Sequence, residues 1–246
     1  EYFANLSHEF RTPINVIYSS SQMINMYAEK GSMDKIVNYN NIIKQNCYRI
    51  SKLVNNIIDS SRINEGFYRI NPVMVDFISL VEDTVASVSP FLQDQNVQII
   101  FDTEEEELPL YCDPDKIERI VLNLLSNAVK YKKEGEGKIE VNIYILKDDF
   151  VELSIKDNGR GIPKEKIEIL FNRFTKVDKS FTRVQEGSGL GLYIVKSLVE
   201  LHKGEISVYS EEGIGSDFRI KLPIINTGEP LREDRVIKTK SIDEKV

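Results

Sequence analysis

The sequence predicts a chain of α + α/β class, in which a hairpin of two long helices precedes a region of alternating strands and helices. In the first 64 residues, apolar side chains recur at intervals of seven, the spacing of helices packed side by side. After residue 65 the apolar runs are short and separated by turn residues, as in a domain built on a sheet. A length of 246 residues, 41% of them hydrophobic, suffices for two modest domains with cores of their own.

The first helix is expected to run from the start of the chain to about Tyr27. Its seam is formed by four apolar residues at heptad spacing, Phe3, Phe10, Ile17 and Ile24. Leu6 lies in the interleaved row. Pro13 interrupts the pattern and is expected to bend the helix or to cost it a hydrogen bond.

A turn over residues 28–34 leads into a second helix that ends near Asn64. Its apolar residues at heptad spacing are Ile36, Ile43, Ile50 and Ile57, with Cys47 and Val54 between them. Two antiparallel helices with one seam each bury those seams poorly, so we expect two copies to form a dimeric four-helix bundle. The alternative is packing of the hairpin against the second half of its own chain.

Residues 64–66 break the helical pattern, and the character of the sequence changes there. Strands are expected over residues 68–75, 97–101, 138–146, 151–156, 205–210 and 216–222. Helices are expected over residues 76–93, 113–131 and 188–202, with a helix or turn over 167–174. Loops are expected over the acidic residues 104–107 and over 176–187, the latter a mobile loop. The predicted domains span residues 1–64 and 65–225, followed by a polar tail over 226–246.

Composition excludes several classes of function. A net charge of −7 argues against a general nucleic-acid binder, which would be basic. Cys47 and Cys112 stand in no metal-ligand pattern and are expected to be buried or half-buried thiols in a reducing, cytoplasmic compartment. No apolar run has the length of a membrane span, and no signal peptide is visible, so no membrane contact is expected for this segment. Because the chain begins inside a helical pattern without methionine, we expect a sensor or membrane-anchoring region upstream of Glu1.

The first helix carries a candidate nucleophile. His8 lies five residues past Phe3 and off the apolar seam, so its imidazole should point to solvent. Glu9 is adjacent, and Thr12 lies one turn further along the same face. An exposed histidine beside a carboxylate is a plausible nucleophile. The alternative is an ordinary solvated surface histidine.

A second candidate site lies on the helix expected over residues 113–131. Asn123, Asn127 and Lys130 share one face at spacings of four and three. Two amide oxygens and an ammonium on one face suit a Mg²⁺–phosphate group, unless the stripe simply faces water. The opposite face is expected to be buried by three apolar residues, Leu122, Leu125 and Val129.

Two glycine-containing segments follow. Asp157 begins a turn directly after a strand, and Gly159 and Gly161 permit a tight turn and close approach of a flat ligand. The Asp157 carboxylate could accept a hydrogen bond from an adenine amino group, although such turns are also common without any ligand.

The second segment leads into a helix and contains Gly187, Gly189, Leu190 and Gly191. Backbone amides at such a helix start hold phosphate, but a lone glycine triplet is weak evidence. Between the two segments, Phe171 and Phe174 either anchor the base of the mobile loop or belong to the core.

Taken in order and spacing, residues 3–13 and these later segments resemble the H, N, G1, F and G2 boxes of HisKA-type sensor histidine kinases. The resemblance covers residues 1 to about 223. It implies a catalytic domain of the fold shared with DNA gyrase and MutL-type proteins, an α/β sandwich with a mixed sheet and helices on one face. It also implies ATP and Mg²⁺ as ligands, a homodimer, and a response-regulator receiver domain as partner.

The resemblance implies roles for the residues of the helical hairpin. His8 would accept the γ-phosphoryl group of ATP and pass it to an aspartate of the regulator. Glu9 would orient the imidazole and accept its proton. A Glu-x-x-Thr pattern after the histidine accompanies phosphatase activity in this family, which makes Thr12 a candidate for that reaction.

The resemblance also implies roles in the nucleotide site. Asn123 and Asn127 would hold Mg²⁺, and Lys130 would contact the phosphates. Tyr131 would lie on the base or ribose side, and Asp157 would read adenine. The glycine segments would complete the site with Gly159, Gly161, Gly187, Gly189, Leu190 and Gly191.

Two residues depart from the common family pattern. Lys176 stands where arginine is frequent and keeps the charge that would neutralise the γ-phosphate, without the forked geometry. Ser188 stands where threonine is commoner. Two rival functions stay open: an ATP-switched dimerisation module without catalysis, and a gyrase-type ATPase, for which neither Glu118 nor Glu134 is clearly placed.

Overall fold

A computed structural model describes residues 2–147, 149–175 and 188–224, and the side chains among these from Leu6 onward. The predicted mobile loop and the predicted tail lie outside the described residues. Contacts divide the chain into two compact units, one of residues 1–68 with 172–194 and the other of residues 69–171 with 195–246.

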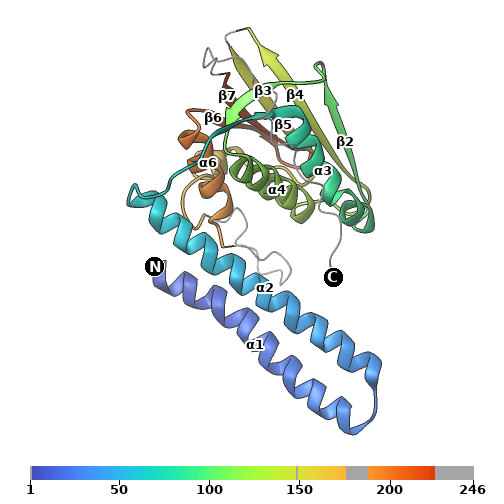
Figure 1. Ribbon diagram of the computed structural model, residues 1–246. Coiled ribbons are helices and arrows are strands. Elements are labelled where there is room, and N and C mark those ends of the chain that lie inside the picture. The colour runs from blue at the N-terminus through green and yellow to red at the C-terminus, as the bar shows by residue number, and fades with distance from the viewer. Residues whose placement is uncertain (1, 148, 176–187, 225–246) are drawn as a thin grey trace. The chain divides into compact units, whose positions relative to one another are not determined.

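The first unit contains an antiparallel helical hairpin, as predicted. It consists of α1 (Tyr2–Glu29) and α2 (Met33–Asn64), joined by a short turn that contains Gly31 (Figure 1). α1 continues without a break through Pro13, whose side chain is buried.

The buried residues of the hairpin form different rows from the predicted seams. They are Leu6, Pro13 and Ser20 on α1, and Asn46, Leu53 and Ser60 on α2, each set at intervals of seven, together with Asn56 on α2. The described residues of the predicted seams are half-buried, and Val54 is exposed. The two helices therefore pack through rows adjacent to the predicted ones, which leaves further apolar surface uncovered in the single chain. Cys47 is also exposed, contrary to the prediction, because it lies outside the buried rows.

The second unit contains a five-stranded mixed sheet in the order β2-β4-β5-β7-β6. Its strands are β2 (Val97–Thr103), β4 (Gly137–Leu146), β5 (Phe150–Asp157), β6 (Glu205–Glu211) and β7 (Gly215–Pro223). β2 and β4 are parallel, and the other neighbours are antiparallel. The predicted strands are all present, and the mixed sheet is confirmed.

A small antiparallel sheet of β1 (Val73–Asp76) and β3 (Pro109–Cys112) lies in the same unit. β1 begins later than predicted, immediately after Pro72, which has no N–H to donate to a ladder. The sequence reasoning missed β3, which is short and pairs with a strand more than thirty residues earlier.

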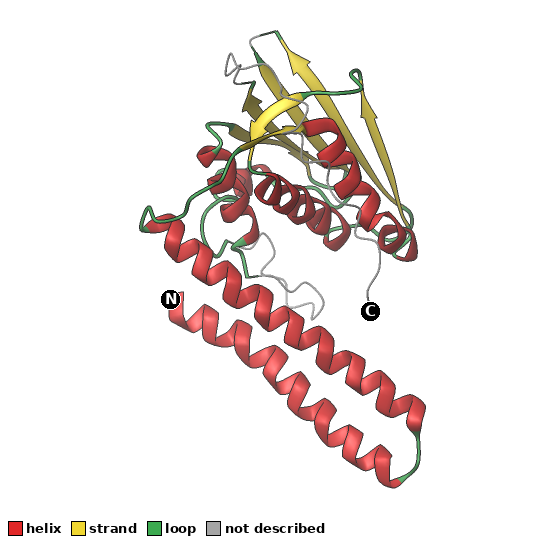
Figure 2. Ribbon diagram, in the orientation of Figure 1, coloured by secondary structure: helices red, strands yellow, loops and turns green. Residues whose placement is uncertain are grey.

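Helices cover one face of the five-stranded sheet, as the predicted fold requires (Figure 2). α3 (Phe77–Asp94) is capped by the Asp76 carboxylate, and α4 (Pro114–Lys130) by that of Asp113, so both helices begin where they were predicted. Along β4, Ile139, Val141 and Ile143 are buried, while the alternating residues Lys138, Glu140 and Asn142 are only half-buried. This alternation distinguishes the helix-covered face from the outer face of the sheet.

The last two helices differ from their predicted bounds. α5 (Lys164–Ile167) is a single turn that ends where the predicted segment begins, and turns follow it. α6 (Gly191–Leu201) starts three residues later than predicted, because Ser188 and Gly189 form a turn before it.

Candidate functional site

The candidate nucleophile is exposed on α1, as predicted. The His8 side chain faces solvent, and the Thr12 hydroxyl donates a hydrogen bond of 3.3 Å to the His8 backbone carbonyl. The Thr12 hydroxyl therefore also bonds to the backbone one turn earlier on α1, which is a structural role.

Glu9 has a charged neighbour that the sequence did not reveal. Its carboxylate attracts the guanidinium of Arg49 on α2, and this attraction opposes the larger effect of burial, which lowers the Arg49 pKa. The pairing depends on the register between two helices, which no pattern within one helix specifies. The predicted proton acceptor is thus held beside a cation of the same hairpin.

Asn123, Asn127 and Lys130, the residues predicted to face a metal and phosphates, all lie on α4. The helix leaves all three side chains half-buried. The Asn123 side-chain amide donates a hydrogen bond of 2.9 Å to the Arg119 carbonyl. That bond leaves the Asn123 side-chain oxygen as an acceptor, and the Asn127 amide has no hydrogen-bond partner among the described residues. Two amide oxygens fit a hard cation such as Mg²⁺, which fills its remaining positions with water and phosphate.

The buried face of α4 differs from the predicted set. It is formed by Ile117, Ile120, Val121, Leu124, Leu125 and Ala128. Of the predicted residues only Leu125 is buried, and Leu122 and Val129 are half-exposed. Within the described parts of the chain, no three His, Cys, Asp or Glu side chains cluster as a metal site.

Lys130 and Tyr131 lie together at the C-terminal end of α4. The Lys130 Nζ is 3.0 Å from the Tyr131 hydroxyl and 4.6 Å from the centre of its ring. This contact holds an ammonium beside an aromatic face, an arrangement suited to a phosphate and a base or ribose.

Asp157 ends β5, and its carboxylate is held by backbone N–H groups. Gly159 donates to it at 2.7 Å, and Ser216 on β7 donates as well. Burial raises the Asp157 pKa, and these two N–H groups together with the charge of Lys133 act in the opposite direction. Burial has the larger effect, so the Asp157 pKa lies above its ordinary value.

The glycines of the turn after Asp157 are required by protein packing. A Cβ at Gly159 would lie 2.7 Å from the Tyr131 carbonyl oxygen, and one at Gly161, where φ is +70°, would lie 1.9 Å from that of Glu211. The Arg160 N–H donates to the same Tyr131 carbonyl at 3.0 Å. The close approach predicted for a flat ligand is therefore made by the protein's own backbone.

Residues that the sequence reasoning did not select also support this turn. Lys133 donates to the Gly213 carbonyl at 2.8 Å, and the Gly213 N–H donates to the Arg160 carbonyl at 2.6 Å. Ser216 on β7 lies opposite Asp157, and Ser210 on β6 lies opposite Ser216. Only the register between distant strands brings these residues together.

The predicted phosphate-binding segment is partly described and belongs to the first unit. Phe174 donates its N–H to the Gly189 carbonyl at 2.9 Å, and Leu190 is fully buried just before Gly191, the first residue of α6. Phe171 and Phe174 are half-buried. Lys176 and Gly187 lie outside the described residues.

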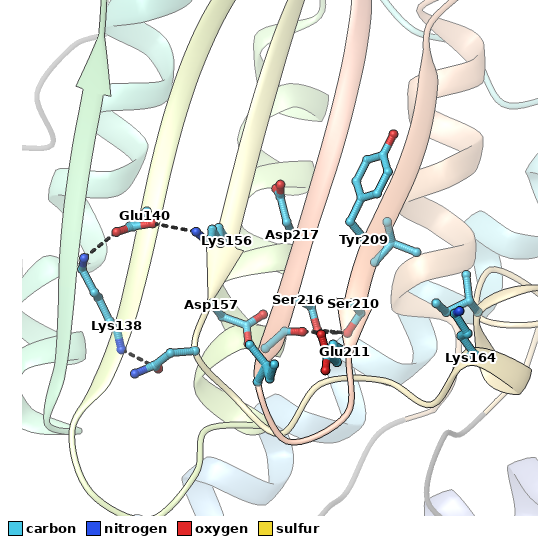
Figure 3. A pocket seen from close by; sticks show the side chains of 15 residues that line it. Lys138, Glu140, Lys156, Asp157, Lys164, Tyr209, Ser210, Glu211, Ser216 and Asp217 are labelled. Atoms are coloured by element: carbon cyan, nitrogen blue, oxygen red, sulfur yellow. Dashed lines mark hydrogen bonds and ion pairs between the residues drawn. The ribbon is translucent and has the colours of Figure 1, made fainter.

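A pocket of the second unit is lined by β4, β5, α5, β6 and β7 (Figure 3). Glu140 forms ion pairs there with Lys138 and Lys156, and Asp217 and Tyr209 come from neighbouring strands. Asp157 contributes to the lining, but no residue of α4 does, so this pocket is distinct from the predicted nucleotide site.

The second histidine, His202, has a structural role. His202 is buried, and its Nε2 accepts the Asp113 N–H at 3.0 Å, while its Nδ1 lies 2.7 Å from the Leu198 carbonyl. Nδ1 therefore carries the proton of the neutral ring. Burial lowers the His202 pKa.

Comparison with known families agrees with this geometry. Residues 1–66 match the His Kinase A (phospho-acceptor) domain, and residues 112–226 match the histidine kinase-, DNA gyrase B- and HSP90-like ATPase domain. The chain thus combines a phospho-acceptor helical hairpin with an ATPase domain of this class.

Individual relatives point to the same family. The chain is 34% identical over 227 residues to the sensor histidine kinase WalK of Bacillus subtilis, covering 91% of this chain and 36% of WalK. The structure of the Acinetobacter baumannii histidine kinase AdeS matches with a TM-score of 0.67 and 25% identity, covering 89% of this chain and 98% of that one. The chain belongs to the sensor histidine kinases of two-component systems.

The fold is also that of histidine kinase ThkA, solved in complex with response regulator protein TrrA. That match has a TM-score of 0.65 and 22% identity, covering 91% of this chain and 61% of that one. None of the described helices combines the length and the apolar character that a membrane crossing requires.

Proposed function

We propose that this chain is the transmitter part of a sensor kinase, in which ATP phosphorylates His8 and the phosphoryl group then passes to an aspartate of a response regulator. The observation that carries the proposal is the presence in one chain of an exposed His8 on a phospho-acceptor hairpin and of the Asn123, Asn127 and Lys130 face on an ATPase-type domain. We assign phosphotransfer and dimerisation to residues 1–64, ATP binding to 65–225, and no role to 226–246.

In the phosphorylation step, a nitrogen of the His8 imidazole attacks the γ-phosphorus of ATP and ADP leaves. The imidazole loses the proton of its other nitrogen, and Glu9 accepts it. The charge of Arg49 keeps this carboxylate oriented on the hairpin. Catalysis consists mainly of positioning and of neutralising phosphate charge.

In the nucleotide site, the Asp157 carboxylate accepts a hydrogen bond from the adenine amino group, and Tyr131 lies on the base or ribose side. Lys130 contacts the phosphates, and Gly189, Leu190 and Gly191 with Gly187 supply backbone amides at the start of α6. Bound Mg²⁺, held by Asn123 and Asn127, would neutralise phosphate charge. We assign to Lys176 the role of neutralising the γ-phosphate, on the basis of its position in the sequence.

We assign two protein partners. A second copy of the chain would cover the apolar rows of α1 and α2 that stay half-exposed in the single chain. A receiver domain would dock beside His8, and the ThkA complex with its response regulator supports this partner. We place the described segment in the cytoplasm, and a membrane anchor, where the full protein has one, upstream of Glu1.

The test of the phosphoacceptor is incubation of the chain with ATP labelled at the γ-phosphate. Wild type is expected to acquire an acid-labile, alkali-stable label, and His8→Gln to acquire none while it binds ATP normally. A histidine-type label that persists in the His8→Gln variant would overturn the assignment.

The nucleotide site has a separate test. Asn127→Ala is expected to lower autophosphorylation about 100-fold or more, because one metal oxygen is lost, while the chain stays dimeric. Ser126→Ala, an exposed neighbour on the same helix, is the matched control and should retain full activity. Equal activity of the two variants would show that the asparagine face is structural.

A further inference from the structure

One row of side chains crosses the helix-covered face of the sheet at the end where Asp157 lies. Strand register places Asp157 of β5 opposite Ser216 of β7, and Ser216 opposite Ser210 of β6. Figure 3 shows the three side chains in this order. Neither the predicted motifs nor the family resemblance assigns a role to Ser210.

The Ser210 hydroxyl makes three hydrogen bonds. It accepts the Ile162 N–H at 2.8 Å, donates to the Gly215 carbonyl at 2.8 Å, and lies 2.9 Å from the Ser216 hydroxyl. A hydroxyl has one proton and two lone pairs. Since the Ser210 proton is directed to Gly215, Ser216 must donate to Ser210, and the hydroxyl of Ser210 is then fully used.

These bonds connect both supports of Asp157. Ile162 belongs to the turn that begins with Asp157, whereas Ser216 donates its backbone N–H to the Asp157 carboxylate. Ser210 therefore fixes the turn relative to the strand that holds the carboxylate.

Other hydrogen bonds hold the backbone of the same turn in place. The Gly213 N–H reaches the Arg160 carbonyl at 2.6 Å, and Lys133 reaches the Gly213 carbonyl at 2.8 Å. Loss of the Ser210 hydroxyl should consequently leave the turn attached but displace it locally, with an unpaired N–H at Ile162. The affected group is the carboxylate that we assign to adenine.

We propose that Ser210 is a positioning residue that sets the place of the Asp157 carboxylate and thereby the selectivity of the site for adenine over guanine. The proposal rests on the proposed ATP site. Adenine offers an exocyclic amino donor, whereas guanine carries a carbonyl oxygen at the corresponding position. A well-placed carboxylate accepts from the first and repels the second, so its displacement weakens ATP binding and leaves GTP binding weak.

The test uses two variants of equal shape, Ser210→Thr and Ser210→Val, which differ only in the hydroxyl. Affinities of the full chain for ATP and GTP are measured by calorimetry, with thermal unfolding measured in parallel. The threonine variant should keep the wild-type ratio of affinities, and the valine variant should bind ATP about tenfold more weakly with GTP unchanged. Ser207→Val, on an exposed position of the same strand, is the control and should change neither affinity.

The outcomes separate positioning from structure. Equal weakening of ATP and GTP in the valine variant, or no weakening at all, would overturn the proposal. Loss of the folded state in the valine variant alone would also overturn it, because the hydroxyl would then hold the fold rather than the carboxylate. Failure of the unsubstituted chain to bind ATP would contradict the proposed function itself. Measuring the unsubstituted chain first therefore separates that outcome from failure of the Ser210 proposal.

Discussion

The helical hairpin and the sheet-containing unit bury their residues in different ways. The buried rows of α1 and α2 include polar side chains, Ser20, Asn46, Asn56 and Ser60, while tyrosine, isoleucine and valine stay exposed on the same helices. The second unit buries mostly aliphatic side chains, and Phe77, Val81 and Val121 have no exposed surface. Its buried polar residues, such as Thr84 and Asp113, are a minority. The comparison indicates that the sheet-containing unit has a complete core, whereas the hairpin needs another surface to complete its own.

The largest effect is expected from removing a side chain of that complete core. Phe77→Ala should lower the free energy of unfolding of the second unit by about 3–5 kcal/mol, because it leaves a cavity under α3. Phe91, on the same helix but 59% exposed, is the matched control, and Phe91→Ala should cost under about 1 kcal/mol. Calorimetric unfolding measures both, and similar costs would contradict the contrast in packing.

A smaller effect is expected from a charge on the uncovered surface of the hairpin. Val54→Lys should weaken dimerisation by about tenfold or more, because it removes apolar surface from the proposed interface and adds a charge. The second unit should unfold as in wild type. Gln45→Lys places the same charge at an exposed polar position of α2 and serves as control. Analytical ultracentrifugation measures the dimerisation of both variants. An unchanged dimer in Val54→Lys would show that the interface lies elsewhere.

The stability of the second unit should also depend on pH through its buried histidine. The His202 pKa is lowered in the folded chain, so an unfolded chain binds the proton more readily. The associated stability is complete above about pH 6.5 and is lost as the pH falls toward the folded pKa. Each unit by which this pKa is lowered corresponds to about 1.4 kcal/mol.

Two substitutions isolate this contribution, because the chain has two histidines. His202→Gln should flatten the fall of melting temperature between pH 7 and pH 5, and His8→Gln, at an exposed position, should leave it unchanged. The same fall in both variants would show that carboxylates, not His202, cause it.

The smallest effect on folding concerns the single hydrogen bond from Thr12 to the His8 carbonyl. Thr12→Ala should change the stability of the hairpin by no more than about 0.5 kcal/mol. It should keep autophosphorylation and lose acceleration of regulator dephosphorylation, whereas Glu9→Ala should lose autophosphorylation. The rate at which purified phosphorylated regulator loses its phosphoryl group measures the dephosphorylation activity of each variant. Unchanged decay with Thr12→Ala would limit Thr12 to its structural bond.

Local signals in the sequence predicted much of this molecule. Asp113 followed by proline marks the start of α4, and Asp76 marks that of α3, because capping depends only on neighbouring residues. Heptad spacing predicted both helices of the hairpin, but the rows that the two helices bury against each other lie next to the predicted ones. The choice of rows depends on which side of each helix meets the other, and apolar rows meant for a partner have the same spacing.

Features that depend on distant pairing could not be predicted in this way. β3 is four residues long and is defined by its partner β1. The row of Asp157, Ser216 and Ser210 requires the register of three strands separated by up to sixty residues. At Gly159 and Gly161, a Cβ would collide with the backbone of Tyr131, just after α4, and of Glu211 on β6, neighbours that the local sequence does not reveal.

The central position of β5 affects the order in which the chain can fold during synthesis. β5 pairs on one side with β4, which precedes it, and on the other with β7, which ends at Pro223. The ribosome must therefore release nearly the whole described chain before the sheet can close. The hairpin is complete once residue 64 has emerged, and its contacts are local, so it forms first. Two nascent chains on one messenger RNA would therefore present their uncovered helical rows to each other before either sheet exists, which favours assembly of the dimer during translation.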